Sequence, residues 1–147
     1  MELREKGTYA LVIELENDRT AKIGALGEKQ LENGFYVYIG SAFSQSGLKR
    51  LENHVKILEG EKQRSTWHID YLTSLDESCF VKAFVTPEKI ECELASRLNL
   101  ESIDGFGCSD CSCRSHLFFS SDLKHLEKQL ESRLERIESD YSVWEKL

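Results

Sequence analysis

Tyrosine, arginine and histidine side chains that could act together lie in one short stretch of the chain, residues 34–54. Tyr36 and Tyr38 belong to an aromatic and β-branched run that is typical of a central strand. Arg50 and His54 follow, four residues apart, in a segment whose leucines and valine recur with helical spacing. A guanidinium binds phosphate through two parallel hydrogen bonds, and an imidazole can position or carry a proton. The stretch therefore predicts a strand ending in tyrosines that faces a helix presenting an arginine and a histidine.

A second tyrosine motif, Gly7-Thr8-Tyr9, opens an apolar run earlier in the chain. Read with Tyr38-Ile39-Gly40, it resembles the paired signature of the GIY-YIG nuclease superfamily, whose pattern continues with an arginine and a histidine four residues apart, as at Arg50 and His54. The chain is also similar to a small stand-alone branch of that superfamily, the Uri-type endonucleases. The segments that carry this closer resemblance are residues 67–72, 90–95 and 105–119.

The resemblance implies a mechanism as well as a fold. It implies an antiparallel sheet with both signature tyrosines on central strands, and hydrolysis with one Mg²⁺ or Mn²⁺. Tyr9 or Tyr38 would accept the proton of the attacking water, Arg50 would bind the scissile phosphate, and His54 would position or relay a proton. Thr8 stands where isoleucine is usual in the superfamily, which we expect to be harmless. Asn53 stands where a basic residue is common, which we expect to weaken the grip on substrate.

The metal-binding glutamate of the superfamily lies on a later helix. We predict a helix after Thr86 and Pro87, with Thr86 as its N-cap. The residues of its buried stripe are Ile90, Leu94 and Leu98. Glu91 falls within that stripe, where a carboxylate needs a partner or a metal ion. Glu91 also matches the superfamily's glutamate best, and Glu93 is the alternative if the helix is rotated by one residue.

A cluster of cysteines at residues 105–116 offers a second kind of metal site. The spacing C-x2-C-x-C-x2-H supplies four thiolate or imidazole ligands for zinc: Cys108, Cys111, Cys113 and His116. All four fall in one short segment, whereas zinc ligands usually arrive as two separated pairs. Two other interpretations remain open. The segment could be a glycine-rich loop that lends Ser109, Asp110 and His116 to the active site, or a tight turn with small buried cysteines.

Net charge argues against a general attraction to nucleic acid, because the chain carries a formal charge of −7. A local basic edge is still expected to bind DNA; its residues are Lys49, Lys56, Arg64 and His68. A solvated helix face of mixed charge explains the lysines equally well. His68 and Asp70 could orient a phosphate or a water, or serve only a structural role, and Asp110 is a further supporting carboxylate. We expect modest, salt-sensitive affinity.

The order of elements indicates an α+β domain with a small sheet covered by helices. Strands are predicted at residues 9–15, 20–24, 35–39, 79–85 and 117–119, and helices at 48–59, 67–76 and after Pro87. Residues 26–33 are expected to form a loop. We assign residues 1–120 to the nuclease-like domain, and residues 121–147 to an amphipathic helix running from Leu123 to Trp144. This helix would pack on the domain or mediate self-association, so the chain would be a monomer or a homodimer.

The remaining features predict a cytoplasmic protein. The N-terminus has no apolar signal region, and no stretch is long and apolar enough to span a membrane. Five cysteines without an export signal do not suggest a disulfide framework. The function expected is that of a metal-dependent DNA endonuclease. Two alternatives are a catalytically weak nucleic-acid-binding module and a zinc-stabilised interaction protein.

Overall fold

The computed structural model describes residues 5–23, 26–43, 47–59, 69, 78–104, 106 and 113–145. Six strands form one antiparallel sheet: β1 (Gly7–Leu15), β4 (Gly34–Ala42), β5 (Ser78–Thr86), β6 (Glu101–Ser102), β7 (Leu117–Ser120) and β8 (Ser142–Trp144). Their order across the sheet is β6-β7-β4-β1-β5-β8. A separate hairpin joins β2 (Arg19–Lys22) to β3 (Glu28–Leu31). Three helices complete the fold: α1 (Lys49–Leu58), α3 (Glu91–Arg97) and α4 (Leu123–Arg136).

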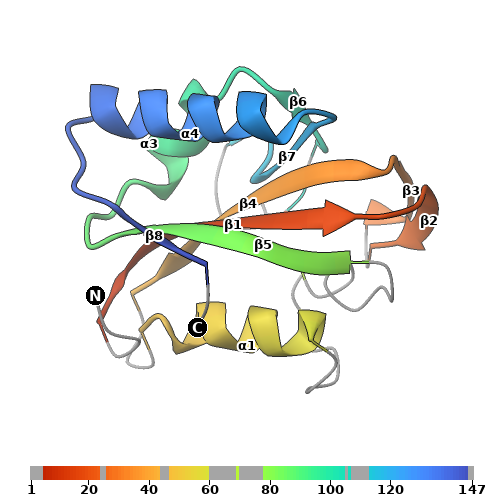
Figure 1. Ribbon diagram of the computed structural model, residues 1–147, viewed down its shortest axis with the longest axis horizontal. Helices are drawn as coiled ribbons and strands as arrows, with labels where there is room; N and C mark the ends of the chain where they lie inside the picture. Colours follow the sequence, from red (N-terminus) through yellow and green to blue (C-terminus); the bar gives the residue numbers. More distant parts are fainter. Residues whose placement is uncertain are drawn as a thin grey trace.

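Helices cover both faces of the sheet, with α1 on one face and α3 and α4 on the other (Figure 1). Successive side chains of a strand point to opposite faces, so β1 contributes to two cores. Tyr9, Leu11 and Ile13 belong to the cluster that packs on α1. Ala10 and Val12 belong to the cluster that packs on α3 and α4. The predicted α+β class, with a small antiparallel sheet flanked by helices, is confirmed.

Pairing of β1 with β4 brings the two tyrosine motifs to one end of the sheet. In this antiparallel register Tyr9 lies opposite Gly40, and Tyr38 lies opposite Leu11. Tyr9 and Tyr38 are therefore diagonal neighbours on the same face, the face covered by α1. Both occupy central strands.

Residues 26–33 do not form only a loop, as we had expected, because β3 lies within them and pairs with β2. The sequence signal of this strand is weak, since Leu31 is its only buried residue. A polar strand at the surface lacks the alternation that identifies a half-buried one.

The helix after Pro87 begins later than predicted, at Glu91, and Ile90 occupies its N-cap position. Thr86 does not cap it, because Thr86 is the last residue of β5 and its hydroxyl shares a hydrogen bond of 2.7 Å with Ser139 Oγ. The stripe of Ile90, Leu94 and Leu98 is buried as predicted.

The C-terminal amphipathic helix is present but shorter than predicted. It starts after Asp122, whose carboxylate accepts a hydrogen bond from Lys124 N, and it ends at Arg136. A turn follows, in which Glu138 adopts a positive φ of 60°. The chain then enters β8, where Trp144 lies opposite Ala83 of β5. The helix buries Leu126, Leu130 and Leu134 against the sheet, whereas Trp144 packs with the core on the α1 side.

Most of the short helix predicted at 67–76 falls outside the described residues. Ile69 is described; it is helical and fully buried in the core on the α1 side. Among the helices that the structure describes, none is long and apolar enough to cross a membrane.

Candidate active site

The hydroxyl of Tyr9 and Nε2 of His54 are 2.9 Å apart in a buried hydrogen bond between β1 and α1. Tyr9 is 1% exposed and His54 2%. His54 reaches the tyrosine because it lies on the face of α1 that also buries Leu51 and Val55 against the sheet. The side chain of Tyr38 lies beside both partners, with its ring centroid 6.3 Å from that of Tyr9 and 6.1 Å from that of His54.

Gly40 gives the Tyr9 ring room to lie across β4. A Cβ placed on Gly40 would overlap the ring carbons and the hydroxyl of Tyr9. No other amino acid fits this position unless the tyrosine moves. The glycine of the second motif is thus required by the tyrosine of the first.

Phe106 closes the other side of Tyr38. It is fully buried, and its ring meets that of Tyr38 edge-on with centroids 6.1 Å apart. The Phe106 carbonyl accepts a hydrogen bond of 2.9 Å from His116 N, which ties this residue to the segment before β7. The cysteine-rich segment therefore contributes an aromatic side chain to the site, which the sequence analysis did not identify.

Arg50 binds the end of β4. Its Nη1 donates a hydrogen bond of 2.9 Å to the carbonyl of Ser41. Arg50 is four residues before His54 on α1, so both side chains come from the same part of the helix surface. This contact holds the guanidinium beside the motif glycine.

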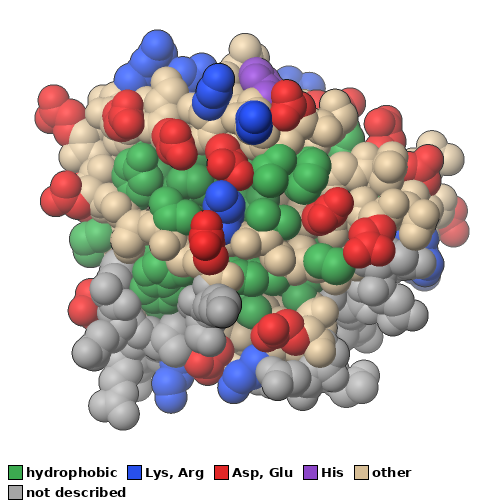
Figure 2. All heavy atoms as spheres, viewed as in Figure 1, with side chains coloured by type: hydrophobic (Ala, Val, Ile, Leu, Met, Phe, Trp, Pro, Cys, Tyr) green, Lys and Arg blue, Asp and Glu red, His purple; other side chains and the backbone are tan. Residues whose placement is uncertain are grey.

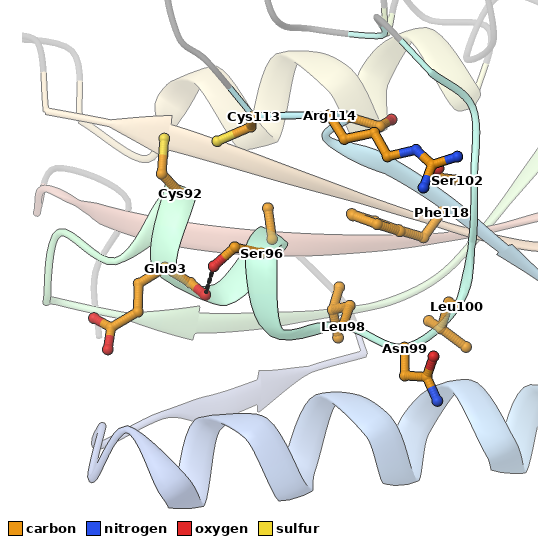
Figure 3. Close-up of a pocket in the computed structure, with 12 residues that line it drawn as sticks. Cys92, Glu93, Ser96, Leu98, Asn99, Leu100, Ser102, Cys113, Arg114 and Phe118 are labelled. Atoms are coloured by element: carbon orange, nitrogen blue, oxygen red, sulfur yellow. Dashed lines mark hydrogen bonds between the residues drawn. The ribbon is translucent and has the colours of Figure 1, made fainter.

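Glu91 reaches β4 from the opposite face, through His116. Its Oε2 lies 3.5 Å from His116 Nδ1, and the same nitrogen lies 3.2 Å from the carbonyl oxygen of Ile39. The Glu91 side chain is 29% exposed. Glu93 points elsewhere: it is 48% exposed and forms an ion pair with Arg97, and Figure 3 shows its carboxylate directed away from Cys92 and Cys113.

These contacts place Arg50 and Glu91 along one edge of β4. Carbonyls two residues apart in a strand point the same way, and those of Ile39 and Ser41 are bonded by His116 and Arg50. Two residues of strand span about 7 Å. The strand ladder between β4 and β7 ends at Tyr38 opposite Leu117. Beyond it, Ile39 N still donates a backbone hydrogen bond of 2.9 Å to His116 O, while the carbonyls of Ile39 and Ser41 are bonded by side chains. Arg50 and His116, the latter beside Glu91, thus bond the carbonyls on either side of Gly40, and Tyr9 lies across its face.

Thr8, one of the two departures from the superfamily pattern, helps to position α3. Its hydroxyl donates a hydrogen bond of 2.7 Å to the carbonyl of Glu88 and accepts one of 3.2 Å from Ile90 N. Thr8 is on β1 and Ile90 is the N-cap of α3. The first motif therefore fixes the start of the helix that carries Glu91.

Substituting valine for Thr8 should lower the free energy of unfolding by about 1–3 kcal/mol, because the isosteric side chain leaves a partly buried carbonyl and a buried N–H without their partner. Chemical denaturation followed by circular dichroism measures the change. Thr20→Val, at an exposed position of β2, is the matched control and should change stability little. Equal stability of the two variants would contradict this role for Thr8.

A group of metal-binding side chains lies next to Glu91. Cys92, Cys113 and His116 each offer a ligand atom, all within 4.8 Å of one another, and such a group could hold a metal ion. Cys113 and His116 belong to the predicted zinc set. Cys92 was missed, because its proximity depends on how α3 packs beside the segment before β7.

That segment is fixed by polar contacts. Arg114 Nε donates a hydrogen bond of 2.9 Å to Asp104 Oδ1, and Ser102 Oγ donates one of 2.6 Å to the same oxygen. The hydrogen bonds from Ser102 and Arg114 lower the pKa of the Asp104 carboxyl below its ordinary value, and Asp104 raises the pKa of Arg114. The pair is therefore charged at neutral pH.

Two residues of the predicted basic edge, Lys49 and Lys56, lie within the described part of the chain. Lys49 and Lys56 are exposed on α1, but Lys56 forms an ion pair of 3.4 Å with Glu52. Lys89, which the sequence analysis did not single out, lies at the motif end of the sheet with its Nζ 5.9 Å from the centroid of Phe43. In the view of Figure 2, acidic and basic side chains are interspersed, and the described side chains form no broad basic patch on this face.

Several predicted site residues cannot be placed, since they lie outside the described residues. They are Arg64, His68, Asp70, Cys108, Asp110 and Cys111.

Comparison with known proteins gives one result. The model of a family described as a domain of unknown function, DUF123, matches residues 8–139. This range includes Thr8 and Tyr9 of the first tyrosine motif, the whole of the second, the three helices and the described part of the cysteine-rich segment. No curated protein and no solved structure matches the chain.

Proposed function

We propose that this chain, which belongs to the DUF123 family, is a metal-dependent endonuclease that hydrolyses phosphodiester bonds in DNA by a one-metal mechanism of the GIY-YIG type. One observation carries the proposal: the side chains that such a reaction needs lie at or near three consecutive residues of β4, from Ile39 to Ser41, with Tyr9 and Arg50 on the α1 side of the sheet and Glu91 on the α3 side. Tyr9 lies across Gly40, Arg50 binds the Ser41 carbonyl, and Glu91 lies beside the histidine at the Ile39 carbonyl. The ordered motifs of the superfamily likewise contain a tyrosine, an arginine and a glutamate; their histidine corresponds to His54, which bonds Tyr9, and not to His116.

The Tyr9–His54 pair suits proton transfer from an attacking water. A phenol is a weak base at neutral pH unless its own proton can leave at the same time. His54 Nε2, 2.9 Å from the hydroxyl, is placed to take that proton. In this step the water proton moves to Tyr9 Oη as the Tyr9 proton moves to His54, and the hydroxide formed attacks phosphorus as the P–O bond to the leaving oxygen breaks. The departing oxygen takes a proton from solvent water. Tyr38, packed against both rings, keeps the pair aligned.

Arg50 suits binding of the scissile phosphate. Nη1 is fixed by the Ser41 carbonyl, which orients the plane of the guanidinium before substrate arrives. A guanidinium can form two parallel hydrogen bonds to phosphate oxygens and neutralise charge that builds up in the transition state. Exposed Lys49 and Lys89 would contact neighbouring phosphates of the DNA strand, so affinity should fall as salt rises.

Glu91 is the residue that would hold Mg²⁺ or Mn²⁺. Its carboxylate oxygens suit these hard cations, which keep several water ligands and need few protein ones, and its partial exposure leaves room for them. When bound, such an ion would supply charge stabilisation to the phosphate and to the departing oxygen.

Glu91→Gln tests this assignment. The amide keeps the size and one acceptor oxygen of the side chain but loses its negative charge, so we expect cleavage of labelled single-stranded, duplex or branched DNA to fall by at least about 100-fold in Mg²⁺ or Mn²⁺. Glu93→Gln, on the same turn of α3 and exposed, is the matched control and should cleave like the parent.

Equal loss in both variants, or none in either, would contradict the role of Glu91. Activity of the parent that persists in EDTA would contradict metal dependence altogether.

A nucleic-acid-binding module without strong catalysis is the second candidate. The observation that favours it is the burial of Tyr9 and His54, which must contact water to act. Salt-sensitive binding of DNA by the parent, with no cleavage in either metal, would support this second candidate over the first.

A further inference from the structure

The metal-binding group beside Glu91 joins two parts of the chain that are distant in sequence. Cys92 is on the first turn of α3, whereas Cys113 and His116 are in the segment that leads into β7. We propose that Cys92, Cys113 and His116 bind one Zn²⁺ ion, which links α3 to this segment. The proposal is independent of whether the chain cleaves DNA.

The ligand types favour zinc over the hard cations of a nuclease site. Two thiolates and an imidazole are common zinc ligands, whereas Mg²⁺ and Mn²⁺ prefer oxygen. A tetrahedral zinc ion, with bonds of about 2.0–2.3 Å, holds its ligand atoms roughly 3.5–4 Å apart. The three ligand atoms already lie within 4.8 Å of one another, so small side-chain rotations would close them on the ion. A water molecule suffices as the fourth ligand.

His116 is oriented as a zinc ligand usually is. Ligating histidines commonly donate the N–H of their second ring nitrogen to a carbonyl or a carboxylate. His116 Nδ1 has both within reach, the Ile39 carbonyl at 3.2 Å and Glu91 Oε2 at 3.5 Å. When Nδ1–H donates to these oxygens, the lone pair of the neutral ring is on Nε2. His116 is also 1% exposed, so packing fixes its ring.

The environment of the two cysteines also favours a ligand role over a packing role. Unligated cysteines are usually buried as small apolar residues, but Cys92 is exposed and Cys113 is only half-buried. Both line a cavity of about 690 Å³, and their sulfur atoms lie near each other at one side of it (Figure 3). The cavity offers an ion a path to the thiols.

Zinc binding would have a specific structural consequence. Cys92 follows Glu91 directly, and His116 contacts the Glu91 carboxylate. An ion held by Cys92 and His116 would therefore fix the start of α3 and the histidine beside Glu91 in one rigid unit.

The zinc content of the purified full-length chain tests the proposal. After expression in zinc-replete medium and purification without chelators, mass spectrometry of the metal should find about one zinc per chain. Cys92→Ser and Cys113→Ser should each weaken zinc binding by at least about tenfold. Cys79→Ser is the matched control: Cys79 is half-buried in β5, where its thiol contacts Glu16, and its loss should leave zinc unchanged. Substoichiometric zinc in the parent, or full zinc in Cys92→Ser, would overturn the site.

Alkylation of the unsubstituted protein provides a second readout that does not depend on a variant folding. Cys92 is exposed, so an unligated thiol should react readily with iodoacetamide, whereas a zinc-bound thiolate is shielded. Peptide mass spectrometry should show slow labelling of Cys92 and Cys113 in the purified protein. After a chelator removes the zinc, both cysteines should be labelled at least about tenfold faster. Equal labelling rates before and after chelation would overturn the proposal.

Discussion

Replacing Tyr9 with phenylalanine should lower the rate of DNA cleavage by about 100- to 10,000-fold, the range expected for losing a positioned proton-transfer group. The substitution removes one oxygen and leaves the ring in its place between β1 and α1. It eliminates the hydrogen bond of 2.9 Å to His54 Nε2, so the water has no phenol to receive its proton. Single-turnover cleavage assays in Mg²⁺ measure the effect. Unfolding experiments should show a stability loss of about 1–3 kcal/mol.

Tyr36→Phe separates catalysis from stability. Tyr36 is as buried as Tyr9 and lies on β4, and its hydroxyl donates a hydrogen bond of 2.7 Å to the carbonyl of Glu32. Burial and the nearby Glu32 raise the pKa of Tyr36 well above its ordinary value, so its phenol stays protonated. Its removal should reduce stability by a similar amount without a comparable loss of cleavage. Parallel losses of cleavage in both variants would argue that Tyr9 acts only in folding.

Replacing Gly40 with alanine should lower the free energy of unfolding by about 1–3 kcal/mol, the typical effect of overpacking a filled core. Replacing a strand glycine with alanine ordinarily has the opposite effect: it raises the free energy of unfolding by roughly 0.5–1 kcal/mol. The reversal follows from the Tyr9 ring, which occupies the volume that the new Cβ would need. Displacing the ring also moves its hydroxyl from His54, so cleavage should fall with stability.

A double-mutant cycle with Tyr9→Leu isolates that cause. Leucine lacks the outer ring atoms that the Cβ would overlap, so Gly40→Ala should be nearly neutral in the Tyr9→Leu background. Chemical denaturation of the four proteins gives the coupling energy, expected to be about 1–3 kcal/mol. An undiminished effect of Gly40→Ala in that background would place the strain elsewhere on β4.

Residue patterns predict the central elements of this fold because those elements are buried regularly. The strands around Tyr9, Tyr38 and Phe84 are aromatic and β-branched, and α1 carries an apolar stripe; all four elements are found where the sequence predicts them. The proximity of Tyr9 to His54 follows once β1 and β4 pair in the register that places Tyr9 opposite Gly40.

The elements that the sequence did not predict are short or depend on tertiary contacts. β3 has a single buried residue and β8 has three residues, too few for a periodic pattern. The strand β8 interrupts an apolar series that continues with helical spacing to Trp144, so periodicity alone extends the helix too far. The role of Thr8 depends on a contact with Glu88, 80 residues later.

Cys92 shows the same limit at the proposed zinc site. It is 21 residues before Cys113, since 113 − 92 = 21, and no spacing rule joins one cysteine on a helix to a distant pair. Only the packing of α3 brings its thiol to Cys113 and His116. The local spacing C-x2-C-x-C-x2-H identified two members of the group and missed the third.

The side chains of Arg50 and His116 at the β4 edge also protect the protein against aggregation. A strand whose backbone is left unpaired at an edge can recruit an extended segment of another chain, which is a common route to aggregation. Beyond Tyr38 the ladder between β4 and β7 ends, and one last backbone hydrogen bond of 2.9 Å joins Ile39 N to His116 O. There Arg50 and His116 bond the carbonyls of Ser41 and Ile39, and a bulky charged group stands where a foreign strand would have to approach. The contacts that would assemble a reaction centre thus also protect the sheet from intermolecular pairing.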